Sequence, residues 1–179
     1  LIPPLSGALS RKNRMLARRL SDSALEFAAL LSLPAGVGFC LLGRPLLELI
    51  YFARPQDCAL GAPLLVILGP GVFFVAMTTM TNAILQGLNH MNVPLRNACI
   101  SLALHVAALE AMLLGAKWGI YSVVFANILF AFFMCLLNGA AIARIAGYRQ
   151  EYRRTFVAPG VSALFMGAAA YAVYRLIRL

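Results

Sequence analysis

The sequence predicts an all-α protein, a polytopic bundle of transmembrane helices. It contains five apolar stretches, each long enough to cross a bilayer core of about 30 Å, which needs about 20 helical residues. The chain is 62% hydrophobic and only 12% charged, whereas ordinary soluble domains carry about 25% charged residues. Its basic residues gather in every second loop, a pattern typical of membrane proteins.

The five predicted spans cover residues 24–43, 59–86, 93–114, 119–143 and 156–174. Together they form a predicted bundle over residues 24–179. Residues 1–23 are expected to be a cytoplasmic loop, in which residues 8–20 form a basic amphipathic helix at the membrane interface. A solvated basic loop explains these residues equally well. Because the chain opens on Leu1 with what resembles the end of an earlier helix, we expect a piece of a larger protein.

Ser, Gly and Pro residues mark the start and the breaks of the first two spans. Ser23 and Glu26 fit a capping box at the start of the first span. Pro34 lies in the middle of that span, where a proline removes a backbone hydrogen bond and kinks the helix. Pro70 stands between two glycines in the second span and predicts a stronger break. Such breaks suit a protein that bends between states, but Gly and Pro are also common in ordinary membrane helices.

The last three spans have simpler boundaries. Asn92, shortly before Pro94, predicts the start of the third span. Gly119 opens the fourth span, which is rich in Phe. Small residues at 167–170 offer a packing face on the fifth span, because small side chains let membrane helices approach closely.

The loop charges predict the orientation. One side of the predicted membrane collects Arg11, Lys12, Arg14, Arg18, Arg19, Arg96, Arg144, Arg149, Arg153 and Arg154. The other side holds Arg44, Arg54 and Lys117. Lys and Arg concentrate in cytoplasmic loops, so we place the first side inside, in a bacterial cytoplasmic membrane. Arg175 and Arg178 then fall outside, where their side chains can snorkel to the headgroups. This distribution favours membrane lipid over nucleic acid as the partner of a chain with net charge +9.

Polar side chains at membrane depth form three stripes. Thr78, Asn82 and Gln86 are spaced i, i+4, i+8 and therefore share one helix face, as do Asn97, Ser101 and His105. Asn127 and Asn138 are about three helical turns apart and also align. Buried polar groups in membranes usually face a bundle interior or a water-filled cavity. The stripes therefore predict either the wall of a substrate cavity or hydrogen bonds that join helices.

Two ionisable residues extend this set of candidates. His105 lies near the middle of a span, where it either relays protons or is neutral and satisfied by a neighbour. Arg96 lies one turn into the third span and either holds a phosphate, which arginine binds bidentately, or anchors the helix at the membrane surface. The cavity candidates are Thr78, Asn82, Gln86, Arg96, Asn97, Ser101, His105 and Asn127.

The sequence predicts a transporter, channel subunit or assembly component rather than an enzyme. It shows no nucleophile elbow, zinc-protease motif, phosphate-binding loop or paired carboxylates at a useful spacing. Its cysteines, Cys40, Cys58, Cys99 and Cys135, have no metal-ligand spacing. We therefore expect no catalytic residue, no cofactor, no metal and no disulfide.

Two segments resemble a known family. Residues 4–10 (PLSGALS), the basic stretch after them and residues 31–38 (LSLPAGVG) are similar to the middle loop and following helix of polysaccharide-exporter-type flippases. Residues 84–89 (ILQGLN), followed by Val93 and Pro94, resemble the hinge of that family. Asn89 stands where glycine is usual, and asparagine tolerates the left-handed backbone of the turn. The nearest group is the stage V sporulation protein B family, in the superfamily of multidrug/oligosaccharidyl-lipid/polysaccharide exporters.

The resemblance implies a two-lobed flippase that moves a lipid-linked oligosaccharide or peptidoglycan precursor across the membrane by alternating access. On that mapping this chain is most of the C-terminal lobe. Its partners would be membrane lipid, the lipid-linked sugar substrate and the missing N-terminal lobe, which carries the main substrate-binding arginines. The hinge candidates are Pro34, Pro70, Gly87 and Pro94. A cation-coupled multidrug exporter of the same superfamily and a non-transporting scaffold for envelope assembly stay open as alternatives.

Overall fold

The computed structural model describes residues 14–50, 55–146 and 157–177. The helices in these residues are α2 (Arg14–Ile50), α3 (Pro55–Gly87), α4 (Asn92–Glu110), the π-helix η1 (Ala111–Ala116), α5 (Ile120–Ala146) and α6 (Ala158–Ile177). The described residues contain no strand. The predicted all-α class is therefore confirmed.

In the part of the chain that the structure describes, four helices are long and apolar enough to cross a membrane. Their candidate spans are Arg19–Ile50, Cys58–Gly87, Asn92–Gly115 and Ile120–Ile145. They overlap the first four predicted spans, and α6 occupies the region of the fifth but is not among these candidates. Large apolar side chains such as Phe27, Leu114 and Phe165 are exposed. Such exposure suits lipid-facing surfaces of a multi-pass membrane protein.

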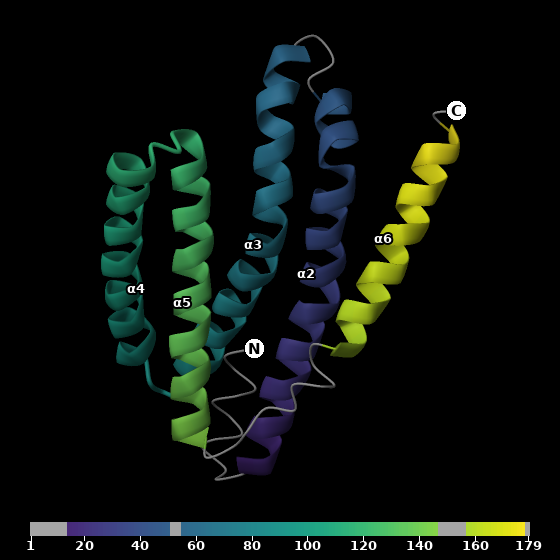
Figure 1. Ribbon diagram of the computed structural model, residues 1–179. Coiled ribbons are helices and arrows are strands. Elements are labelled where there is room, and N and C mark those ends of the chain that lie inside the picture. Colours follow the sequence, from purple (N-terminus) through teal and green to yellow (C-terminus); the bar gives the residue numbers. More distant parts are fainter. Residues whose placement is uncertain (1–13, 51–54, 147–156, 178–179) are drawn as a thin grey trace.

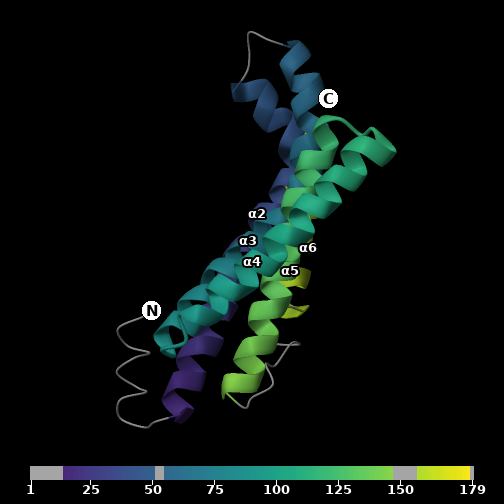
Figure 2. The same ribbon diagram turned by 90° about the vertical axis from the view of Figure 1, so that its left-hand side faces the viewer.

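The first helix extends beyond the predicted span at both ends. Residues 14–20 of the expected interfacial helix are the first turns of α2, with no break before the span; residues 8–13 lie outside the described part of the chain. At the other end, α2 continues past Pro45 to Ile50. Figure 2 shows the last turns of α2 bending away from its earlier course. A proline inside a helix is the usual cause of such a bend.

The helices form a row rather than a ring. In Figure 1 the order across the molecule is α4, α5, α3, α2 and α6. Each helix packs against its neighbours in this row, with α3 between α5 and α2. The start of α2, the end of α3, the start of α4 and the end of α5 lie at one end of the molecule. This is the end that the loop charges predict to be cytoplasmic.

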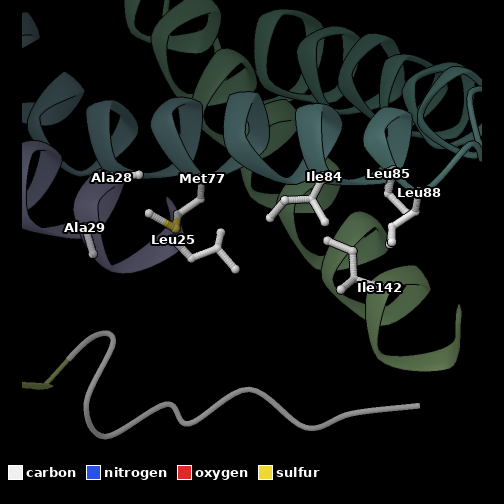
Figure 3. Packing of buried hydrophobic residues seen from close by; sticks show 8 residues of the cluster. All are labelled: Leu25, Ala28, Ala29, Met77, Ile84, Leu85, Leu88 and Ile142. Carbon is white, nitrogen blue, oxygen red and sulfur yellow. The ribbon is translucent and has the colours of Figure 1, made fainter. Parts of the chain in front are cut away.

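An apolar cluster joins the three central helices near this end. Leu25, Ala28 and Ala29 of α2 face Met77, Ile84 and Leu85 of α3, with Leu88 and Ile142 completing the cluster (Figure 3). Lipid tails are as apolar as these side chains, so helices in a membrane associate mainly through close packing. The cluster therefore stabilises the bundle through the fit of large side chains against small ones.

The closest approach of α2 and α3 is at two glycines. A Cβ atom added to Gly36 would lie 2.6 Å from the carbonyl oxygen of Gly69, and one added to Gly69 would lie 2.7 Å from that of Gly36. Only a residue without a side chain fits such a backbone contact. Pro34 and Pro70 lie beside this crossing, one in each helix.

Two cysteines lie along the same pair of helices toward the other end. Cys40 Sγ is 3.4 Å from the carbonyl oxygen of Val66, and Cys58 Sγ is 3.5 Å from that of Leu47. Both contacts join α2 to the half of α3 that precedes Pro70. The N-terminal half of α3 thus packs along α2, while its C-terminal half also contacts α5.

Candidate functional site

Asn138 is the centre of a buried polar junction of three helices. It lies on α5 and is fully buried. Its Oδ1 accepts a hydrogen bond of 2.9 Å from Asn97 Nδ2 on α4, and its Nδ2 donates to Asn82 Oδ1 on α3 at 2.6 Å. Nδ2 also lies 3.2 Å from Thr81 Oγ1 on α3. The Asn82, Asn97 and Asn138 side chains therefore form a continuous chain of amides, which we call the asparagine junction.

Two threonines of α3 complete the polar contact with α5. Thr78 Oγ1 donates to the carbonyl oxygen of Ala131 at 3.1 Å. Thr81 Oγ1 donates to the carbonyl of Met77 at 2.8 Å in its own helix, which leaves its oxygen lone pairs to accept from Asn138. The polar face that the spacing of Thr78 and Asn82 predicts is thus turned toward α5.

The polar stripe predicted on the third span, which is α4, is also turned toward α5. Ser101 is fully buried, and its Oγ lies 4.0 Å from Met134 Sδ. His105 is half-buried, and its Nδ1 lies 2.8 Å from the carbonyl oxygen of Ala126. Its ring also meets Phe130 edge to face, with centroids 6.0 Å apart. Because a carbonyl can only accept, the Nδ1 of His105 carries the hydrogen in this contact.

Three candidates do not join these contacts. Gln86 is exposed at the end of α3, and Arg96 and Asn127 are also exposed. Asn127 and Asn138 align along α5 as predicted, but they differ in burial. The reason is that Asn138 lies in the contact with Asn82 of α3 and Asn97 of α4, whereas Asn127 lines an open cavity.

Asn127 faces a cavity between α2, α3 and α5. This α2–α3–α5 cavity has a volume of about 460 Å³, and its lining includes Phe39, Leu65, Gly71, Val75 and Ile128. The described residues that line it are apolar apart from Asn127. A cavity of this character suits the apolar part of a ligand, with one amide to fix its orientation.

Arg96 faces a second cavity, between the start of α4 and the end of α5. This α4–α5 cavity has a volume of about 340 Å³ and also contains Arg144 and His90. Its inner wall includes Asn97, so the cavity reaches the asparagine junction from the predicted cytoplasmic end. Sequence reasoning predicted phosphate binding as one of two roles for Arg96. It used Arg144 only as one of the loop charges that indicate orientation in the membrane.

The hinge candidates fall at two places. Pro34 and Pro70 lie inside α2 and α3, beside the glycine crossing. Gly87 ends α3 and Pro94 lies in the first turn of α4, on either side of a tight turn. Asn89 in this turn has φ +61°, so the predicted left-handed conformation is confirmed.

Sequence reasoning missed part of the junction. Thr81 was not singled out, although it lies at the same depth as Asn82. The pattern related Asn138 only to Asn127, with which it aligns. Its position deep in an apolar helix is the signal that indicates a buried hydrogen-bond partner. Among the described residues, no group of three or more His, Cys, Asp or Glu could hold a metal ion, and none of the four cysteines forms a disulfide.

A comparison with protein-family models decides the family. The model described as the lipid II flippase MurJ matches residues 1–178, nearly the whole chain. The chain belongs to the lipid II flippase MurJ family. No curated protein and no solved structure matches it.

Membership of the MurJ family confirms several expectations. It supports the predicted superfamily of lipid-linked precursor flippases and a multi-pass protein of the cell membrane. It also supports membrane lipid and a lipid-linked substrate as partners, and a transport role rather than catalysis. The narrower assignment to the stage V sporulation protein B family, and with it a role in sporulation, is not supported by this match.

Proposed function

We propose that this chain is one lobe of a flippase that moves a lipid-linked peptidoglycan precursor across the cytoplasmic membrane by alternating access. The observation that carries the proposal is the MurJ family match along residues 1–178, on a chain whose described residues include four candidate membrane spans. The match favours a lipid-linked oligosaccharide substrate over the substrates of a cation-coupled multidrug exporter. It also favours transport over a purely structural role in envelope assembly.

The packing suggests which parts of the lobe move as units. The asparagine junction ties α3, α4 and α5 together through buried hydrogen bonds. By contrast, α2 meets α3 at Gly36 and Gly69, where backbone contacts backbone and a proline lies nearby in each helix. Prolines and small residues supply the usual bending points of membrane helices. We therefore assign the bending to this crossing and to the turn between Gly87 and Pro94.

Asn127 is the residue that we assign to the substrate path. It is exposed, and it is the polar side chain in the lining of the α2–α3–α5 cavity. Thr78, Asn82, Asn97 and Ser101 have partners on other helices, so we assign them to holding the lobe together. This division separates the candidates into a cavity wall and a scaffold.

The test is a flipping assay with the full-length protein in liposomes, using a labelled lipid-linked peptidoglycan precursor and an impermeant reagent that detects it on the far leaflet. We expect Asn127→Trp, which fills the cavity, to slow flipping by about tenfold or more. Leu136→Trp is the matched control, because Leu136 is exposed on the same helix and lines neither cavity.

The outcomes separate the parts of the proposal. Absence of flipping by the unmodified protein, with drug efflux in its place, would overturn the flippase assignment. Flipping that is equally fast in Asn127→Trp and Leu136→Trp would leave the flippase assignment intact and remove Asn127 from the substrate path. Size-exclusion profiles of both variants check that each protein is folded.

A further inference from the structure

The α4–α5 cavity carries two arginines that the transport proposal does not use. Arg96 comes from the first turns of α4 and Arg144 from the last turn of α5. Both line the same cavity of about 340 Å³, as does His90 from the turn between α3 and α4. They are brought together by the antiparallel packing of α4 and α5, which places the start of one beside the end of the other (Figure 1).

In the part of the chain that the structure describes, neither arginine of this cavity forms an ion pair. The ion pair between Arg44 and Glu48 lies elsewhere in the fold. None of the described residues lining the cavity is acidic, and the first turn of α4 contains no acidic residue either. Two guanidinium groups at one cavity therefore favour an anionic ligand, because arginine pairs with phosphate through two parallel hydrogen bonds.

Apart from Asn97, the remaining described residues of the lining are apolar. They include Val93 on α4 and Leu137, Ala140, Ala141 and Ile145 on α5. A small inorganic anion has no apolar part that could pack against these side chains. An amphiphile with an anionic head and hydrocarbon tails matches both the arginines and the apolar side chains.

The position of the cavity indicates the source of this amphiphile. It lies at the end of the molecule where α2 starts, which carries exposed Arg19 and which the loop charges predict to face the cytoplasm. Anionic lipids of the cytoplasmic leaflet attract basic residues at the membrane surface. Arg96 and Arg144 lie on exposed helix surfaces, so a lipid can reach them from the bilayer.

We propose that the α4–α5 cavity binds the phosphate headgroup of an anionic phospholipid of the cytoplasmic leaflet through Arg96 and Arg144, with the lipid tails along Leu137 and Ala140. Asn97 lines the cavity and also donates to Asn138, so a bound lipid touches the junction that holds α3, α4 and α5 together. The site is separate from the α2–α3–α5 cavity and does not depend on which substrate is transported.

The test measures lipid binding to the purified full-length protein by native mass spectrometry in detergent. The probes are dioleoyl phosphatidylglycerol, dioleoyl phosphatidylcholine, inorganic phosphate and undecaprenyl pyrophosphate. We expect phosphatidylglycerol to bind more tightly than phosphatidylcholine. Arg96→Gln and Arg144→Gln should each weaken phosphatidylglycerol binding by about fivefold, because one basic residue near the membrane surface contributes about 1 kcal/mol toward anionic lipid.

Two further variants sharpen the result. Arg19→Gln is the matched control, because Arg19 is an exposed arginine at the same end of the molecule but does not line the cavity. The phosphatidylglycerol affinity of this variant should equal that of the unmodified protein. Ala140→Leu narrows the cavity without removing a charge and should also weaken phosphatidylglycerol binding. Thermal unfolding of each variant confirms that the helices are intact.

Three results would overturn the proposal. The first is equal phosphatidylglycerol affinity in the unmodified protein and in the Arg96→Gln, Arg144→Gln double variant. The second is displacement of the lipid by inorganic phosphate at comparable concentration, which would show a small-anion site. The third is tighter binding of undecaprenyl pyrophosphate with the same dependence on Arg96 and Arg144, which would assign the cavity to the transported substrate.

Discussion

Asn97 Nδ2 donates a hydrogen bond of 2.9 Å to Asn138 Oδ1 across the contact between α4 and α5, and both side chains are buried. Asn138 then passes a hydrogen bond on to Asn82 of α3. A buried amide in a membrane protein is costly unless its donors and acceptors are satisfied. These three residues therefore stabilise one arrangement of three helices, and their removal should have measurable effects.

The first prediction concerns Asn138. Asn138→Leu removes its bonds to α3 and α4 and leaves Asn97 Nδ2 without its acceptor, so we expect a loss of about 1–3 kcal/mol of stability. Thermal unfolding of the full-length protein in detergent measures this loss. Asn127→Leu is the control, because Asn127 is exposed on the same helix. Equal melting temperatures for the two variants would contradict the role of the junction.

The second prediction tests the coupling between Asn97 and Asn138 directly. A double-mutant cycle of Asn97→Leu and Asn138→Leu should give an interaction energy of about 1 kcal/mol, since residues in one hydrogen-bond network are not additive. The same cycle with Asn97 and Asn127 should give no interaction within error. Additive effects for the first pair would show that the bond contributes nothing to stability.

The third prediction concerns the crossing of α2 and α3. Gly36→Ala and Gly69→Ala place a Cβ within 2.6–2.7 Å of the facing carbonyl oxygen, so the helices must separate, at a cost of about 1–3 kcal/mol. Gly38→Ala, where nothing lies within 4 Å, should be neutral or slightly stabilising because alanine favours helix. A comparison of melting temperatures checks both. Similar values for Gly36→Ala and Gly38→Ala would show that the two helices are not held this closely.

The fourth prediction concerns the turn between α3 and α4. Asn89 has φ +61°, a conformation that glycine adopts freely and that β-branched residues resist. Asn89→Gly should therefore retain stability and transport. Asn89→Val should lower stability by about 1–2 kcal/mol, the cost of a left-handed backbone for an ordinary residue. Equal thermal stability of Asn89→Gly and Asn89→Val would argue against the left-handed turn.

The fifth prediction separates two roles of His105. Its ring nitrogen lies 2.8 Å from the carbonyl oxygen of Ala126, a contact that a glutamine amide can reproduce. If His105 serves to join α4 to α5, the His105→Gln variant should flip substrate at a rate within about twofold of the unmodified protein. The His105→Leu variant should be less stable, because leucine cannot form this hydrogen bond. Loss of flipping in both variants with normal stability would instead favour a proton relay. The flipping assay and thermal unfolding together decide between them.

The sequence alone was sufficient for the existence of the helices and for most of their approximate ends; the exception is α2, which runs from Arg14 to Ile50. An apolar stretch of about 20 residues has few alternatives to a membrane helix, which is why four predicted spans overlap the candidate spans. Asn92 does begin α4. The left-handed Asn89 was likewise predictable, because its conformation depends on its immediate neighbours. The family resemblance, which rests on short local motifs, predicted the superfamily correctly.

The tertiary structure alone decided which polar residues meet. Helical spacing placed Thr78 and Asn82 on one face, but it could not say that this face is turned to Asn138 rather than to a cavity. Asn127 and Asn138 share a face of α5, yet one is exposed and the other fully buried, because Asn138 lies between α3 and α4 while Asn127 lines an open cavity. Likewise, Arg96 and Arg144 line one cavity because α4 and α5 are antiparallel neighbours. Periodicity fixes direction around a single helix, whereas burial and partners depend on where the other helices lie.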